Sequence, residues 1–113
     1  MIKRHKIFTL LEQEIPEFKY DGVGSDDIFI VFIFFIDFVI KNIENEVLLN
    51  RVVKVINEIY TTQSIDEMSL LDDFAISLYD SKCYDIIRTR LNEGVGEYFD
   101  LNVEAWKRGN HIV

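Results

Sequence analysis

A series of carboxylates between residues 66 and 85 is the part of this sequence best suited to chemistry with another molecule. Asp66, Asp73 and Asp80 are separated by seven residues each. Seven residues of an α-helix bring each carboxylate back to within roughly 20° of the preceding one, so the three are expected about 10 Å apart along one edge. Such a row of negative charges can form charge-assisted hydrogen bonds with lysines or arginines of a basic partner.

Four more side chains accompany this row in the sequence: Asp72, Asp85, Tyr79 and Tyr84. Tyrosines are common anchors at the centre of protein interfaces, and additional carboxylates would strengthen the attraction for a cation. We therefore assign all seven side chains to a candidate partner-binding surface. The alternative is that the aspartates form an ordinary solvated helix face and that the tyrosines lie at the edge of the core.

The charge of the chain also favours a basic partner. There are 20 acidic and 12 basic residues in 113, which gives a formal net charge of −8. The acidic residues all lie between positions 12 and 104, whereas five basic residues lie near the two ends: Lys3, Arg4, Lys6, Lys107 and Arg108. An acidic body repels nucleic acid and anionic membranes, but it speeds the approach of a basic protein. Solubility alone is the alternative explanation.

Catalytic and metal-binding motifs are not evident. His5 and His111 lie near opposite ends of the chain, where a positioned general base is not expected. Cys83 is the only cysteine, which excludes an intramolecular disulfide, and we interpret it as a small buried residue. Glu12 and Glu14 interrupt the first apolar run, so no signal peptide is predicted. We expect a cytoplasmic protein that is not an enzyme and needs no cofactor.

One carboxylate series has the spacing of a possible metal site. Its members follow one another at intervals of four, three and four residues: Glu93, Glu97, Asp100 and Glu104. They would align on one continuous helix and could then hold a hard cation. Gly94 and Gly96 predict a broken helix at this point, with Gly94 as a helix stop. A solvated acidic face is therefore the preferred interpretation, and we expect no metal.

The elements that must position these side chains are predicted to be helices. The clearest apolar stripe is formed by Leu48, Leu49, Val52, Val53, Ile56, Ile59 and Tyr60. A capping box at Ser64 and Glu67 opens the helix that carries the aspartate row. Five or six helices are expected. The first covers residues 3–14 and is ended by Pro16, the second is capped by residues 25–27 and reaches residue 43, and the third covers residues 48–60. The fourth begins at residue 64, the fifth follows residue 81, and a short last helix lies within residues 95–113.

The run from Ile28 to Ile40 is almost entirely apolar, with Asp37 as its one polar residue. A strand is the alternative, but the run is long and has no second strand-like segment with which to pair. It is too short for a membrane span, which needs about 20 apolar residues. We expect a buried central helix in which the Asp37 carboxylate meets a buried base or caps backbone; a catalytic acid is the less favoured alternative.

Four segments carry a resemblance to known proteins: Phe8-Thr9-Leu10-Leu11 leading to Ile15-Pro16-Glu17, Phe34–Val39, Val52–Asn57 and Ser69–Phe74. Over roughly residues 8–92 the chain resembles a family of small bacterial all-α domains to which no biochemical activity is assigned. In size, acidity and helical character it also resembles contact-dependent growth inhibition immunity proteins. That second resemblance implies a cytosolic inhibitor of a cognate toxin domain, often a nuclease, and no catalytic residue.

These observations predict an all-α fold, with residues 1–113 forming a single-domain bundle of five to six helices around a phenylalanine-rich helix. The function we expect is that of an immunity or antitoxin-type protein that neutralises a basic toxin domain by occluding its active site. The alternative is a non-catalytic helical adaptor or regulatory protein that binds another protein through exposed apolar surface. The oligomeric state and the identity of the toxin are left open by the sequence.

Overall fold

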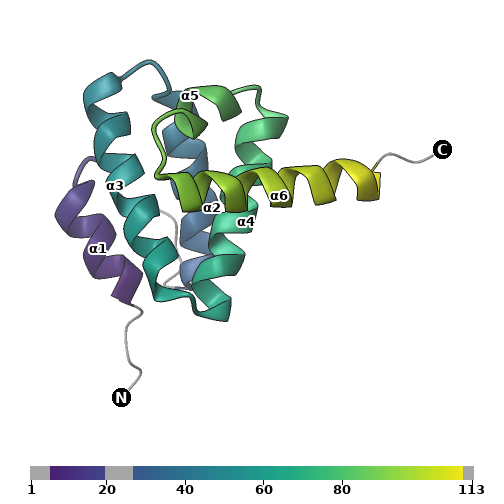
Figure 1. Cartoon of the computed structure of the whole chain (residues 1–113). Helices are drawn as coiled ribbons and strands as arrows, with labels where there is room; N and C mark the ends of the chain where they lie inside the picture. The colour runs from purple at the N-terminus through teal and green to yellow at the C-terminus, as the bar shows by residue number, and fades with distance from the viewer. Residues whose placement is uncertain (1–5, 20–26, 111–113) are drawn as a thin grey trace.

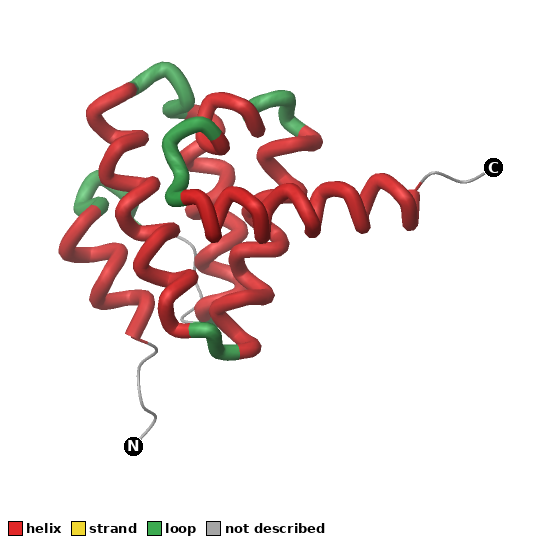
Figure 2. The backbone as a smooth tube through the Cα atoms, in the orientation of Figure 1, coloured by secondary structure: helices red, strands yellow, loops and turns green. Residues whose placement is uncertain are grey.

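The computed structural model describes residues 6–19 and 27–110, which contain six α-helices (Figure 1). They are α1 (Lys6–Glu14), α2 (Ile28–Lys41), α3 (Glu46–Thr62), α4 (Ile65–Asp80), α5 (Tyr84–Arg88) and α6 (Glu93–Asn110). Figure 2 shows only helices and loops in these ranges, so the predicted all-α bundle is confirmed. The predicted start of the first helix at Lys3, both histidines and the glycines at 22 and 24 lie outside the described residues.

Helix α4 holds the bundle together, because it packs against α2, α3, α5 and α6, whereas α1 packs against α3. Helix α6 runs across the other helices, and its C-terminal end projects from the bundle (Figure 1). The helix that carries the aspartate row is thus also the helix on which most of the structure rests.

The core is built around phenylalanines from three helices. Phe32 and Phe35 of α2, Phe74 of α4 and Phe99 of α6 are at most 1% exposed. The Phe74 ring centroid lies 6.2 Å from that of Phe32, 6.5 Å from that of Phe35 and 6.1 Å from that of Phe99. Burial of each such side chain contributes roughly 1.5–3 kcal/mol. Phe74 therefore joins α2 and α6 through the middle of the molecule.

Helix α2 is buried on one face only, which corrects the expectation of a wholly buried helix. Its buried side chains are Ile28, Val31, Phe32, Phe35, Ile36 and Val39. The opposite face presents four large apolar side chains that are 38–59% exposed, and we call it the α2 apolar face: Phe29, Ile30, Ile33 and Phe34. Asp37 lies on this exposed side, 58% exposed, with its carboxylate 2.8 Å from Lys41 Nζ. The expected buried carboxylate is therefore not observed.

Side-chain caps fix where three helices begin. Asp27 accepts a hydrogen bond from the Phe29 N–H at 2.9 Å, and Asn45 accepts one from the Leu48 N–H at 3.1 Å. At α4, the Ser64 Oγ accepts from the Glu67 N–H at 3.4 Å, which confirms the serine half of the predicted capping box. The Glu67 side chain is buried, and its carboxylate lies 3.5 Å from Lys6 Nζ of α1.

Gly94 and Gly96 lie inside α6, so the predicted helix stop at Gly94 is wrong and the last helix is long rather than short. The reason is a close approach between helices. A Cβ atom at Gly96 would lie only 2.2 Å from an Arg88 Nη and 2.4 Å from its Cζ. Glycine at 96 thus leaves room for the Arg88 guanidinium of α5 to lie against α6.

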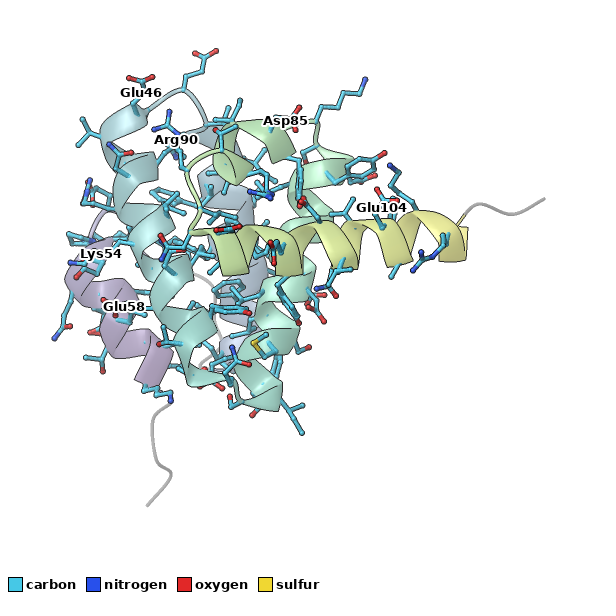
Figure 3. All side chains as sticks on the ribbon, viewed as in Figure 1. Glu46, Lys54, Glu58, Asp85, Arg90 and Glu104 are labelled. Atoms are coloured by element: carbon cyan, nitrogen blue, oxygen red, sulfur yellow. The ribbon has the colours of Figure 1, made fainter. Side chains whose placement is uncertain are left out.

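The connection between α5 and α6 is tied to α3 by polar contacts (Figure 3). Arg90 Nη1 donates to Asn50 Oδ1 at 3.0 Å, and Arg90 Nη2 lies 3.6 Å from the Glu46 carboxylate. The Asn92 N–H donates to Asn57 Oδ1 at 3.3 Å. These contacts set the direction in which α6 leaves the bundle. Within the described ranges, no helix combines the length and apolar character needed to cross a membrane.

Candidate functional site

The predicted aspartate row lies on one continuous helix. Asp66, Asp73 and Asp80 are all exposed residues of α4. The core positions of the same helix lie on its opposite side and include Leu71, Phe74 and Leu78. The expected alignment of three solvent-facing carboxylates on one helix is therefore observed, whereas their use in binding stays a prediction.

Asp72 has a place within the fold. It is half-buried, and its carboxylate accepts a hydrogen bond from the Tyr98 hydroxyl of α6. Burial of the tyrosine, together with this hydrogen bond to Asp72, raises the pKa of Tyr98 to about 12. Tyr98 thus stays neutral at physiological pH and joins α6 to α4. The predicted role of Asp72 in partner binding is not tested by this contact.

Asp73 is the member of the row whose ionisation is perturbed. Partial desolvation, with the neighbouring Asp72 carboxylate as a second cause, raises the pKa of Asp73 above its ordinary value of 3.8. A cation close to this face would oppose the rise in pKa, because it stabilises the ionised carboxylates. The electrostatic character of the α4 face therefore suits a cationic group of a partner.

The end of α4 is a Schellman motif, which places two aspartates on either side of a tight turn. The Cys83 N–H donates to the Leu78 carbonyl at 2.8 Å, and the Lys82 N–H donates to the Tyr79 carbonyl at 3.1 Å. Lys82 adopts the left-handed conformation, with φ of 63°, where glycine is the usual residue. The buried Cys83 and Leu78 complete the apolar contact of the motif. The chain then enters α5 at Tyr84.

This turn creates a cavity of about 440 Å³ whose walls are mostly predicted site residues. It is lined by Tyr79, Asp80, Lys82, Tyr84 and Asp85, and we call it the α4–α5 cavity. Both carboxylates are exposed. Asp85 is labelled in Figure 3 on α5. Four of the seven side chains chosen from the sequence are therefore brought together in one place.

Aromatic rings form one side of the cavity. The Tyr79 ring centroid lies 6.4 Å from that of Tyr84 and 5.9 Å from that of Trp106, both with edge-on geometry. Lys107 Nζ lies 5.3 Å from the centroid of the Tyr79 ring, within the range of a cation–π contact. The same ammonium lies 3.3 Å from the Glu104 carboxylate. The Tyr79 ring is thus already in contact with a cation of the same chain.

Tyr84 is held in place by a polar network. Its hydroxyl donates to Asp100 Oδ1 at 2.7 Å, and Arg88 donates to both Asp100 oxygens at 3.0 and 2.9 Å. Burial of the ring and the hydrogen bond to Asp100 raise the pKa of the Tyr84 hydroxyl well above its ordinary value of 10. Arg88 lowers the pKa of the Asp100 carboxyl. Tyr84 therefore presents a fixed, neutral ring to the cavity.

No family model, curated protein or solved structure matches this chain. The site itself is a shallow acidic and aromatic surface. Cys83 is buried, and the histidines lie outside the described residues.

The possible metal ligands on α6 require a correction. Because α6 is continuous, Glu93, Glu97, Asp100 and Glu104 do follow one another along a single helix, contrary to the expectation of a break. However, Asp100 is bound to Arg88, and Glu104 is paired with Lys107. Within residues 6–19 and 27–110, no group of histidine, cysteine and acidic side chains could hold a metal ion.

Sequence reasoning did not find Lys82, Trp106 or Lys107 as parts of this site. Lys82 can be recognised as part of the turn only once the end of α4 is known, because a positive φ is unusual for a lysine. Trp106 and Lys107 reach Tyr79 from 27 and 28 positions away, along a helix that the glycines seemed to interrupt. The available signal was the seven-residue spacing from Phe99 to Trp106.

Proposed function

We propose that this chain is an immunity or antitoxin-type protein that binds a basic toxin domain, with a nuclease as the expected class, and occludes its active site. The α4–α5 cavity is the observation that supports this proposal best. It combines two exposed carboxylates, Asp80 and Asp85, with two ordered tyrosine rings at one end of the aspartate row.

A nuclease must present cations where the phosphates of its substrate bind. Carboxylates spaced along α4 can occupy those cations in place of phosphates, and they would also accelerate the encounter of the two proteins. The rings of Tyr79 and Tyr84 then supply apolar area at the centre of the contact, where interface energy concentrates. An arginine of the partner fits such a cavity, because it can pair with a carboxylate and stack on an aromatic ring.

The test compares two double charge reversals with the same change in net charge. Sequencing the DNA immediately upstream of this chain's gene comes first, and a compact, basic domain encoded there is the expected binding partner. Asp80→Lys with Asp85→Lys alters the cavity, whereas Glu44→Lys with Glu58→Lys alters exposed residues elsewhere. Calorimetry should show that the first pair raises Kd at least about tenfold, which corresponds to roughly 1.4 kcal/mol, and that the control pair has a much smaller effect.

Two results would contradict the proposal. Equal weakening by both pairs would mean that only the overall charge of the chain matters. Unchanged affinity in the cavity variant, with helical content intact by circular dichroism, would remove this surface from the interface. A toxin activity assay completes the test, because the wild-type chain should inhibit the toxin domain at equimolar concentration and the cavity variant should not.

A non-catalytic adaptor that binds another protein through apolar surface is the second candidate. The α2 apolar face favours it, since large apolar side chains rarely gather on a surface that contacts nothing. One substitution distinguishes the two candidate functions. Ile33→Asp would abolish partner binding by an adaptor, whereas it would leave toxin binding through the cavity unchanged.

A further inference from the structure

We propose that the α2 apolar face is a self-association surface and that two copies of this chain pair through it in an antiparallel arrangement. The inference does not depend on the proposed function, because it concerns the chain alone. Phe29, Ile30, Ile33 and Phe34 are the side chains that the second copy would cover.

The size of the face is that of a weak dimer interface. With the four side chains 38–59% exposed, the face presents roughly 350 Å² per copy, taking about 200 Å² for each complete side chain. Such a patch is comparable to the largest apolar patch on a typical monomer, which is often functional. Two copies and their half-buried neighbours Phe38 and Ile40 would bury on the order of 1,000 Å² in total, the lower limit for a specific contact.

The charge distribution selects a second copy as the occupant. The chain carries a net charge of −8, so two copies repel one another over most of their surfaces. Helix α2 carries no net charge, because its one acid, Asp37, pairs with its one base, Lys41, and it also presents four exposed large apolar side chains. Two acidic molecules can therefore meet here without bringing excess like charge together. A basic partner would instead be drawn to the α4 face.

The residue spacing fits an antiparallel contact. Two side chains of the face, Ile30 and Phe34, lie between Asp27 and Asp37–Lys41 at alternating intervals of three and four residues, which is the seam spacing of paired helices. Ile33 lies beside this seam. In an antiparallel pair centred on Phe34, Asp27 of one copy faces Lys41 of the other at both ends of the contact. This opposition of an acid and a base fixes the direction in which the helices cross.

Analytical ultracentrifugation of the full chain between about 1 and 500 µM tests the proposal, because weak interfaces of this size give micromolar dissociation constants. The apparent mass should rise from 13.3 kDa towards twice that value. Ile33→Asp should raise the dimer Kd at least tenfold. Leu101→Asp is the matched control, because it places the same change on an exposed apolar residue of α6 and should leave Kd within about twofold.

A second pair of variants tests the antiparallel arrangement. Lys41→Glu removes the base at the end of α2 and should weaken the dimer severalfold, whereas Arg108→Glu makes the same change in charge on α6 and should not. A mass of 13.3 kDa at every concentration would overturn the inference. So would a dimer that Ile33→Asp and Leu101→Asp weaken equally. Circular dichroism confirms in each case that the variant is folded.

Discussion

Replacement of Gly96 by alanine should have two opposite effects on stability: a gain from higher helix propensity and a loss from displacement of the Arg88 guanidinium. Alanine in the helix stabilises by roughly 0.5–1 kcal/mol relative to glycine. The new Cβ would lie 2.2 Å from an Arg88 Nη, so the guanidinium must move. It would then lose its two hydrogen bonds to Asp100. The outcome depends on which of these two effects is larger.

The magnitudes are close to each other. The Arg88 and Asp100 side chains are 30% and 49% exposed, which places their ion pair among the partly exposed pairs worth about 0.2–1 kcal/mol. We therefore expect Gly96→Ala to change the free energy of unfolding by less than about 0.5 kcal/mol. In an Arg88→Ala background no guanidinium is displaced, and the same substitution should stabilise by the full 0.5–1 kcal/mol, approximately.

Urea denaturation of the four proteins in this double-mutant cycle measures the difference, which should equal the lost ion pair, about 0.2–1 kcal/mol. Gly94→Ala is the control, because its Cβ would lie 3.9 Å from the Tyr60 ring and should be equally favourable in both backgrounds. If Gly96→Ala stabilises equally with and without Arg88, the reasoning that glycine is needed for the guanidinium is refuted.

Three further outcomes are expected. Phe74→Ala should destabilise by about 3–5 kcal/mol in urea denaturation, because it leaves a cavity among three buried rings; a loss below about 1 kcal/mol would mean that the core repacks freely. Hydrogen bonds donated by Arg51 lower the pKa of Glu17 from 4.5 to about 2. Because the pKa is lower in the folded state, ionised Glu17 stabilises the protein above pH 4.5, and this stabilisation is lost as the pH falls towards 2. Glu17→Gln should therefore flatten the decline of Tm between these pH values. An unchanged pH profile would contradict the assignment. Lys82→Gly should raise stability by roughly 0.5–1 kcal/mol, because it relieves a left-handed lysine; a lower Tm would show that the turn is unstrained.

Amphipathic helices were the part of the fold that the sequence could predict. Leu49, Val52 and Ile56 were expected on the core face of α3, and all three are fully buried. The polar residues between them mark the solvent side, which is why the pattern specifies both the helix and its orientation. In α2 nearly every position is apolar, so few polar residues mark the exposed face. Asp37 marked it, although it was expected to be buried.

Contacts between distant segments were the part that could not be predicted. Gly96 has the local signature of a helix break, and only the position of Arg88 gives it a different meaning. The candidate site divides in the same way. Tyr79, Asp80, Tyr84 and Asp85 adjoin one helix end, so closeness in the sequence already places them together, whereas Trp106 and Lys107 arrive through the packing of α6.

Helix α6 is attached to the bundle unequally along its length. Val95, Phe99 and Val103 are buried, whereas beyond them Trp106 and Lys107 contact the Tyr79 ring. Amide hydrogen exchange should therefore be slow up to about residue 103 and should proceed by local opening beyond it. Because the same ring borders the α4–α5 cavity, a ligand that displaced Lys107 would release the last turns of α6. Ligand binding at the cavity would then be detected as faster amide hydrogen exchange at the end of α6, which the ligand itself does not contact.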